Sequence, residues 1–113
     1  MLNLCVISFT ELPYTIVART QSQPRADALA TCLYAAAQAH LPGRRLRTDY
    51  TDGDPDIEAD FYILRHTTAP AVLTENFFMD SHPDCAFLLS PEGQQAIVDL
   101  HVDGITAYLS TLK

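Results

Sequence analysis

The sequence predicts an α/β fold with a mostly parallel sheet, and two patterns indicate it. Short runs rich in Val, Ile, Thr and aromatic residues alternate with longer segments whose apolar residues recur at helical spacing. Proline and glycine separate these segments, most clearly at Pro42-Gly43. Because a chain that alternates strands and helices buries both in stacked layers, this order is typical of a single α/β domain over residues 1–113.

The first third of the chain supplies two strands and a helix. We expect strands at Leu4–Phe9 and Tyr14–Arg19, the second because it alternates and is β-branched. We expect a helix over Arg25–Leu41, because apolar side chains recur there at intervals of three and four residues and Pro42-Gly43 ends the pattern. The many alanines of this helix allow close packing on a sheet.

The second half repeats the order of strands followed by helices. Strands are expected at Phe61–Leu64 and Ala71–Glu75, and a short helix at His82–Leu89. Ser90-Pro91-Glu92 has a hydroxyl N-cap, a proline at the first helical position and an acid in the first turn, so a second helix starts there and runs to about Leu112. His101 falls on or beside its buried stripe, where a core histidine with satisfied hydrogen bonds is the commoner case.

A strongly acidic segment, DYTDGDPDIEAD, separates the two halves. Its spacing does not fit the calcium loop of an EF-hand, which requires acids at positions 1, 3 and 5, Gly at 6 and Glu at 12. The main interpretation is an acidic turn in which Asp54 or Asp56 caps a short helix beginning near Pro55. A calcium site is the alternative.

Charge is unevenly distributed within a net charge of −7. Residues 1–48 carry five arginines against two acids, whereas residues 49–113 carry two cations against twelve acids. The one basic cluster, Arg44, Arg45 and Arg47, adjoins the acidic segment and is interpreted as a solvated face. Nucleic acid is therefore not an expected partner, because phosphate binding needs a basic stripe. No apolar run reaches the roughly 18 residues of a membrane span.

The three cysteines do not indicate a disulfide framework or a cysteine zinc site, because they are odd in number and lack a CxxC pair. The apolar start MLNLCVISF lacks a basic segment and a cleavage site, so it is interpreted as a strand and no signal peptide is identified. Taken alone, these features favour a reducing compartment.

Glu75 is the candidate catalytic residue. It lies at the end of the buried strand Ala71–Glu75, which is the edge where α/β proteins gather functional groups. Burying a carboxylate without a partner is costly, so Glu75 is either paired, hydrogen-bonded or positioned for proton transfer. The residue types alone leave the structural and the catalytic interpretation open.

The chain resembles the C-terminal half of the zinc-dependent N-acetylmuramoyl-L-alanine amidases, which are bacterial cell-wall hydrolases. The segment most similar to the family is PAVLTENFF, and it is supported by Ala28-Leu29-Ala30, Leu64-Arg65, Gly104-Ile105 and Tyr108-Leu109. The resemblance covers residues 14–113, while 1–13 are unmatched. The acidic segment and the TENFFMD turn look most like the subgroup from Bacteroides-type bacteria. Phe77 stands where the family usually has glycine.

The resemblance implies a three-layer α/β domain with a mostly parallel sheet, hydrolysis of the amide between muramic acid and L-alanine, and one zinc ion. It assigns Glu75 as the general base and makes Arg65 and Asn76 candidate substrate contacts. The implied partner is peptidoglycan or a muropeptide, and the implied location is the cell envelope or periplasm.

The zinc ligands of the family, a Gly-His-Gly motif, a helical Glu and a Ser-x-His-x-Asn segment, do not occur in this sequence. His40, His66, His82 and His101 do not occupy those positions, so no metal ligand is identified. Three hypotheses follow. The chain represents part of a zinc amidase, it is an inactive remnant that binds muropeptide or pairs with another amidase chain, or it forms a homodimer.

Overall fold

A computed structural model describes residues 2–5, 14–18, 24–46, 50, 57–58, 66, 69–78 and 80–113 of the chain. The described strands form one sheet in the order β1-β4-β2-β3, from β1 (Leu2–Cys5), β2 (Tyr14–Ala18), β3 (Ile57–Glu58) and β4 (Val72–Asn76). The helices are α1 (Pro24–His40), α3 (His82–Leu89) and α4 (Pro91–Thr111). The predicted α/β class is thereby confirmed.

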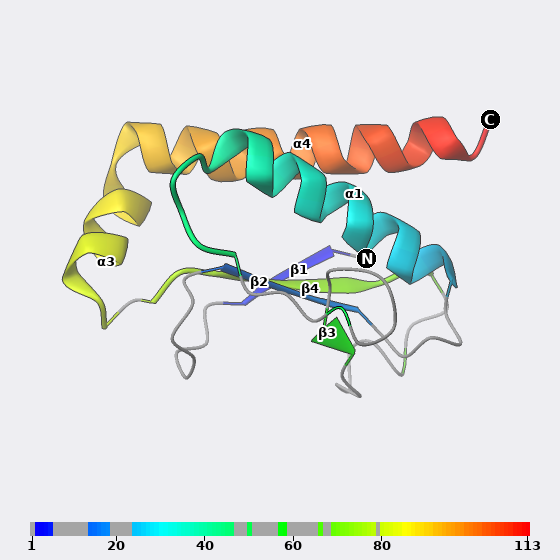
Figure 1. The fold of residues 1–113 in the computed structure, drawn as a ribbon, viewed down its shortest axis with the longest axis horizontal. Coiled ribbons are helices and arrows are strands. Elements are labelled where there is room, and N and C mark those ends of the chain that lie inside the picture. Colours follow the sequence, from blue (N-terminus) through cyan, green and yellow to red (C-terminus); the bar gives the residue numbers. More distant parts are fainter. Residues whose placement is uncertain are drawn as a thin grey trace.

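The sheet is mixed. β1 pairs in parallel with β4 and β2 pairs in parallel with β3, whereas β2 and β4 are antiparallel. Two of the three pairings among the described strands are parallel, as predicted. The antiparallel pairing of β2 with β4 lies in the middle of the sheet. Figure 1 shows α1 and α4 on one face of the sheet and α3 beside one end of it.

The predicted helices form close to their expected bounds. Pro24 begins α1, Gly43 follows it with a positive φ of 77°, and the Leu41 amide donates to the Ala37 carbonyl. Ser90 caps α4 as expected, because its side chain accepts a hydrogen bond of 3.0 Å from the Gly93 amide. The end of α1 and the start of α4 therefore lie where glycine, proline and capping chemistry indicate.

One local prediction is wrong. Instead of a short helix beginning near Pro55, Ile57 and Glu58 extend along β2 and pair with Val17 and Ala18. The edge of β2 offers unpaired backbone groups, and two residues that pair with it gain hydrogen bonds that a short exposed helix would have to make with itself. The predicted strand Phe61–Leu64 lies outside the described residues.

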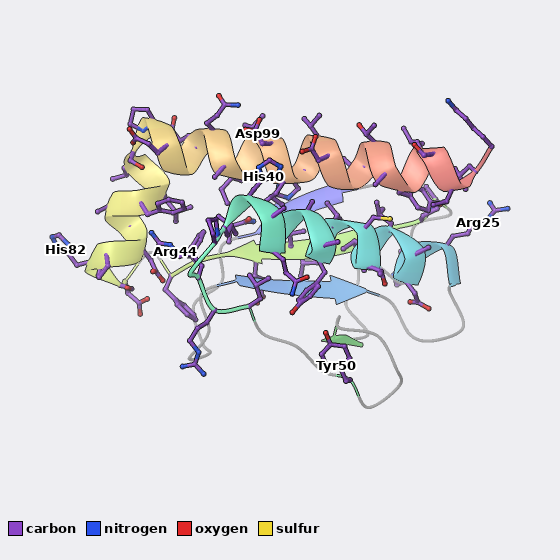
Figure 2. The ribbon with its side chains drawn as sticks, turned by 45° about the horizontal axis from the view of Figure 1, so that its top comes forward. Arg25, His40, Arg44, Tyr50, His82 and Asp99 are labelled. Carbon is purple, nitrogen blue, oxygen red and sulfur yellow. The ribbon has the colours of Figure 1, made fainter. Side chains whose placement is uncertain are left out.

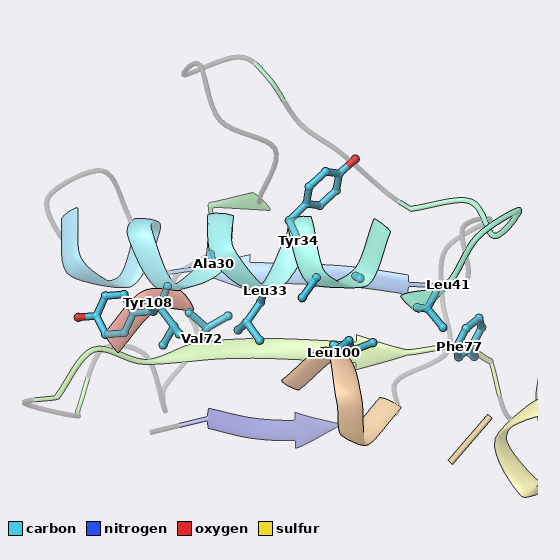
Figure 3. Packing of buried hydrophobic residues seen from close by; sticks show 11 residues of the cluster. Ala30, Leu33, Tyr34, Leu41, Val72, Phe77, Leu100 and Tyr108 are labelled. Carbon is cyan, nitrogen blue, oxygen red and sulfur yellow. The ribbon is translucent and has the colours of Figure 1, made fainter. Parts of the chain in front are cut away.

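The core lies between the sheet and the two long helices. Figure 3 shows Leu33 of α1, Val72 of β4 and Leu100 of α4 meeting there, with Ala30 and Tyr108 nearby. Gly104 brings the helices close together, since a Cβ built on it would lie 2.7 Å from the Leu33 side chain. At the far end of α1, His40 Nε2 lies 2.6 Å from Asp103 Oδ2 of α4.

Candidate functional site

The edge at which β4 ends brings three strands together. Glu75 is aligned with Cys5, the last residue of parallel β1, and with Thr15, near the start of antiparallel β2. The carboxyl ends of β1 and β4 therefore meet at this edge, which is where α/β folds place their functional groups. This is the position predicted for Glu75.

Glu75 and its two neighbours on β4 point to opposite faces of the sheet. Thr74 and Asn76 are buried on the face covered by helices, where Thr74 Oγ1 lies 3.1 Å from His101 Nε2 of α4. Because side chains alternate along a strand, Glu75 points to the other face, and it is half-buried there. The carboxylate is thus separated by the sheet from the core between α1 and α4.

His101 of α4 contacts β4 on the helix-covered face of the sheet, opposite to Glu75. Its Nε2 bonds Thr74 and its Nδ1 lies 2.6 Å from the Ile97 carbonyl, so both ring nitrogens have partners. Burial lowers the pKa of His101 below its ordinary value of 6.5, while the bond to Ile97 acts in the opposite direction. His101 is therefore the core histidine with satisfied hydrogen bonds that its helical position predicts.

Asn76 belongs to the same interior group. Its Nδ2 donates to Thr74 Oγ1 at 3.2 Å, and its side chain is 1% exposed. Among the described residues its Oδ1 has no hydrogen-bond partner. The structure therefore does not bring the Asn76 amide to the face on which Glu75 lies. Arg65, the other predicted substrate contact, lies outside the described residues.

The turn after β4 is fixed by an unusual backbone conformation and by α3. Phe77 has a φ of 65°, in the left-handed region that disfavours residues with a Cβ. Its side chain is nevertheless buried and meets Phe87 edge-to-face at 5.2 Å between ring centroids. The next amide, of Phe78, donates to Asp84 Oδ2 at 3.3 Å. The chain therefore takes a conformation that suits glycine in order to place an aromatic ring in the core.

Arg44 contacts both this turn and α3. Its guanidinium lies 4.0 Å from the Phe87 ring centroid and 5.4 Å from that of Phe77, and its Nη1 lies 3.8 Å from Asp84 Oδ1. Figure 2 shows Arg44 between the end of α1 and α3. The predicted solvated face is therefore wrong for Arg44, because two aromatic rings offer a flat surface on which its guanidinium stacks. Arg45 is exposed as expected.

Sequence reasoning missed the contribution of Arg44 and Asp84 to the site. Arg44 is separated by about forty residues from its partners, so no local pattern connects them. The available signal was the pair of aromatic residues Phe77 and Phe78 shortly after Glu75, which indicates a structured turn. Asp84 lies in the first turn of α3, where an acid is expected for helix stability alone.

The described histidines do not form a metal site. His40 pairs with Asp103, His101 is bonded at both nitrogens, and His66 and His82 are exposed. Within the described ranges, no three His, Cys, Asp or Glu side chains are grouped so as to hold a metal ion. Of the acidic segment, only Tyr50, Ile57 and Glu58 lie within these ranges, so the calcium alternative stays a prediction.

Comparison with known proteins identifies the family. The sequence profile of the N-acetylmuramoyl-L-alanine amidases matches residues 8–107. The endolysin of Bacillus phage SPP1 is 38% identical over 55 residues, which are 49% of this chain and 20% of the endolysin. The chain therefore belongs to the N-acetylmuramoyl-L-alanine amidase family, and the predicted resemblance is confirmed.

Solved amidase structures share the fold. The amidase Ami1 from Mycobacterium smegmatis is 21% identical with a TM-score of 0.78, and covers 97% of this chain with 53% of its own. The CwlD amidase from Clostridioides difficile, solved in complex with the GerS lipoprotein, is 19% identical with a TM-score of 0.76, over 97% of this chain and 54% of its own. The chain thus spans about half the length of these amidases and a fifth of the endolysin.

Proposed function

We propose that this chain forms the Glu75-bearing part of an N-acetylmuramoyl-L-alanine amidase, and that Glu75 moves the proton during hydrolysis of the amide between muramic acid and L-alanine. The observation that carries the proposal is the position of Glu75. The half-buried Glu75 lies one residue before the end of β4, beside the last residue of β1, within a region that the family profile matches. The predicted contacts of Arg65 and Asn76 with substrate remain predictions.

The proposed chemistry follows from what an amide requires. An amide carbonyl is a poor electrophile and an amine is a poor leaving group, so hydrolysis needs a base for the attacking water and an acid for the departing nitrogen. A single carboxylate serves both purposes when it takes the proton from water and then delivers it to the amine. Glu75 suits this function because the turn behind it is fixed at Phe78 and Asp84, which limits its movement.

The family resemblance implies zinc, which supplies electrophilic activation in such hydrolases. The described residues do not fit a zinc site. His40 pairs with Asp103, and both ring nitrogens of His101 already have hydrogen-bond partners. We propose that any zinc ligands of the working enzyme lie outside these residues, in the part of the domain that the solved relatives possess and this chain does not span. We also propose that this further part of the domain supplies a helical layer on the other face of the sheet, which would complete the three-layer architecture.

The setting of the enzyme is likewise proposed from the family. Its substrate is peptidoglycan or a muropeptide, and its place of action is the cell envelope or periplasm. Within the described part of the chain, no helix is both long and apolar enough to cross a bilayer. Residues 1–113 form one structural unit of the amidase domain under this proposal.

A second function is binding of wall fragments without hydrolysis, alone or beside another amidase chain. This function is favoured because His40 and His101 bond Asp103 and the Ile97 carbonyl and are therefore not placed as metal ligands for hydrolysis. Titration of a purified disaccharide-tripeptide muropeptide into the 113-residue chain, followed by calorimetry, tests this function. Heat of binding without release of peptide would support it, and no binding at millimolar muropeptide would exclude it.

The test of the amidase proposal uses an assembly that hydrolyses peptidoglycan, either this chain with its remaining domain or a larger natural form. Glu75→Gln keeps the size of the side chain but removes the base, so kcat is expected to fall at least about 100-fold, the lower end for a general base. Zinc content, measured by elemental analysis after dialysis, is expected to remain unchanged.

Glu92→Gln provides the matched control, because Glu92 is exposed in the first turn of α4, far from the strand edge in sequence. It makes the same chemical change and is expected to leave kcat unchanged. Full activity of Glu75→Gln, or loss of zinc together with activity, would overturn the assignment of Glu75 as a proton carrier.

A further inference from the structure

The turn that follows β4 has a backbone conformation that its residue type disfavours. Phe77 has a φ of 65°, and a residue with a Cβ keeps this left-handed conformation only where the surrounding structure imposes it. Residues of this kind are concentrated at functional sites, and Phe77 lies two positions after Glu75. The contacts that hold Phe77 are therefore candidates for the contacts that position the Glu75 carboxylate.

The described sheet pairing stops at the last two residues of β4. Pairing with β1 ends at Glu75, opposite Cys5, and pairing with β2 ends at Asn76, opposite Tyr14. The end of a strand opens more readily than its middle unless further contacts hold it. The direction of the Glu75 side chain therefore depends on the segment that follows β4 as well as on the sheet.

Asp84 of α3 holds that segment with one carboxylate oxygen. Asp84 is buried, and its Oδ2 accepts a hydrogen bond of 3.3 Å from the Phe78 amide. A carboxylate is a stronger acceptor for a backbone N–H than a neutral group is. Because the Phe78 amide belongs to the peptide directly after the left-handed residue, this bond fixes the orientation of that peptide.

Arg44 lies beside the second carboxylate oxygen. Its Nη1 is 3.8 Å from Asp84 Oδ1, and its guanidinium lies 4.0 Å from the ring centroid of Phe87. The Arg44 amide donates a hydrogen bond of 3.2 Å to the Leu41 carbonyl, directly after α1. Figure 3 shows Leu41 and Phe77 at the same end of β4. The two oxygens of Asp84 therefore connect the end of α1 to the turn after β4.

We propose that Asp84 is a positioning residue for Glu75. By holding the Phe78 amide, with Arg44 orienting its carboxylate, Asp84 keeps the turn in the conformation that fixes the direction of the Glu75 side chain. This role rests on the proposed function, because it requires that Glu75 moves the proton. Asp84 takes no part in proton transfer and acts only through the turn.

The test uses the assembly that hydrolyses peptidoglycan. Misplacing a reacting group by about 1 Å costs up to about 100-fold, so Asp84→Ala is expected to lower kcat about 10- to 100-fold and to change KM less than about threefold. Asp84→Asn keeps an oxygen that accepts the Phe78 bond and is expected to recover part of this loss. If Asp84→Asn were as slow as Asp84→Ala, the bond to Phe78 would not be the means of positioning.

A double-mutant cycle distinguishes positioning from a loss of folded protein. In the Glu75→Gln background there is no base to position, so adding Asp84→Ala is expected to lower the residual kcat less than about threefold. A merely structural role would lower the active fraction, and therefore kcat, by the same factor in both backgrounds. Asp103→Ala is the matched control, because it removes an aspartate that bonds His40 on another helix, and it is expected to leave kcat unchanged. Urea titration verifies that each variant folds.

Glu75→Gln alone distinguishes failure of this role from failure of the proposed function. If Glu75→Gln retains full activity, the proposed function is wrong and the positioning role is wrong with it. If Glu75→Gln loses activity while Asp84→Ala keeps full kcat, or lowers kcat equally in both backgrounds, the proposed function stands and only the role of Asp84 is overturned.

Discussion

Thr74 and His101 meet across the boundary between sheet and helix, where the Thr74 Oγ1 lies 3.1 Å from the His101 Nε2. Both side chains are buried, and Thr74 directly precedes the proposed proton carrier Glu75. This bond therefore fixes the strand that carries the site to the longest helix of the fold.

Removing the Thr74 hydroxyl is expected to destabilise the domain. Thr74→Val preserves the shape of the side chain but leaves the buried His101 Nε2 and Asn76 Nδ2 without this partner. An unsatisfied buried polar group costs about 1–3 kcal/mol, so the free energy of unfolding should fall by that amount in urea titrations. Thr31→Val, an exposed position on α1, is the control and should change stability by less than about 0.5 kcal/mol.

The buried imidazole also makes stability depend on pH. Because the pKa of His101 is lowered in the folded state, the unfolded chain takes up a proton first as the pH falls below the ordinary value of 6.5. Stability is then complete above that value and declines as the pH falls toward the folded-state pKa. Urea unfolding at pH 7.5 and at pH 5.5 measures this loss. His101→Gln should show a smaller loss over the same interval, and an equal loss would assign the dependence to other groups.

Close packing of α1 and α4 at Gly104 makes a further prediction. In an ordinary helix, Gly→Ala stabilises by about 1 kcal/mol through helix propensity. At Gly104 the added Cβ would lie 2.7 Å from the Leu33 side chain and 2.9 Å from its Cα, so the helices must separate. Overpacking typically costs about 1–3 kcal/mol, and Gly104→Ala should lower the thermal midpoint. An increase in that midpoint would show that the two helices separate at little cost.

The Arg44 contacts allow charge and stacking to be distinguished. Arg44→Ala removes both the aromatic stacking and the ion pair with Asp84, and should destabilise by about 1 kcal/mol. Arg44→Lys keeps the charge but not the planar group, and should recover less than half of that loss. Urea titrations at low and high salt measure both variants. Full recovery by lysine, abolished by salt, would assign the effect to the ion pair.

Local chemistry predicted most of the elements, whereas contacts distant in sequence determined the surroundings of the site. The Pro42-Gly43 stop, the Ser90 cap and the apolar run before Glu75 are local sequence patterns, and the helices and β4 could be predicted from such patterns. The strand at Ile57 and the Arg44 contacts depend on what the folded chain places beside them, so no local pattern indicates them. At Phe77 the local and the tertiary requirements differ. Its positive φ suits glycine, whereas its aromatic side chain is explained by the contact with Phe87 of α3.

The cap of α4 provides the last prediction. The Ser90 Oγ accepts a hydrogen bond of 3.0 Å from the Gly93 amide, and it donates one of 2.7 Å to the Phe87 carbonyl at the end of α3. Ser90→Ala removes both bonds at the junction of the two helices, whereas Ser90→Asp retains an acceptor for Gly93 and adds a charge that favours a helix start. The free energy of unfolding should fall by about 1–2 kcal/mol in Ser90→Ala and by less in Ser90→Asp. Ser110→Ala, an exposed serine of α4, controls for the loss of a hydroxyl. If Ser90→Ala proved as stable as that control, the junction would be held by the apolar packing of Phe87 alone.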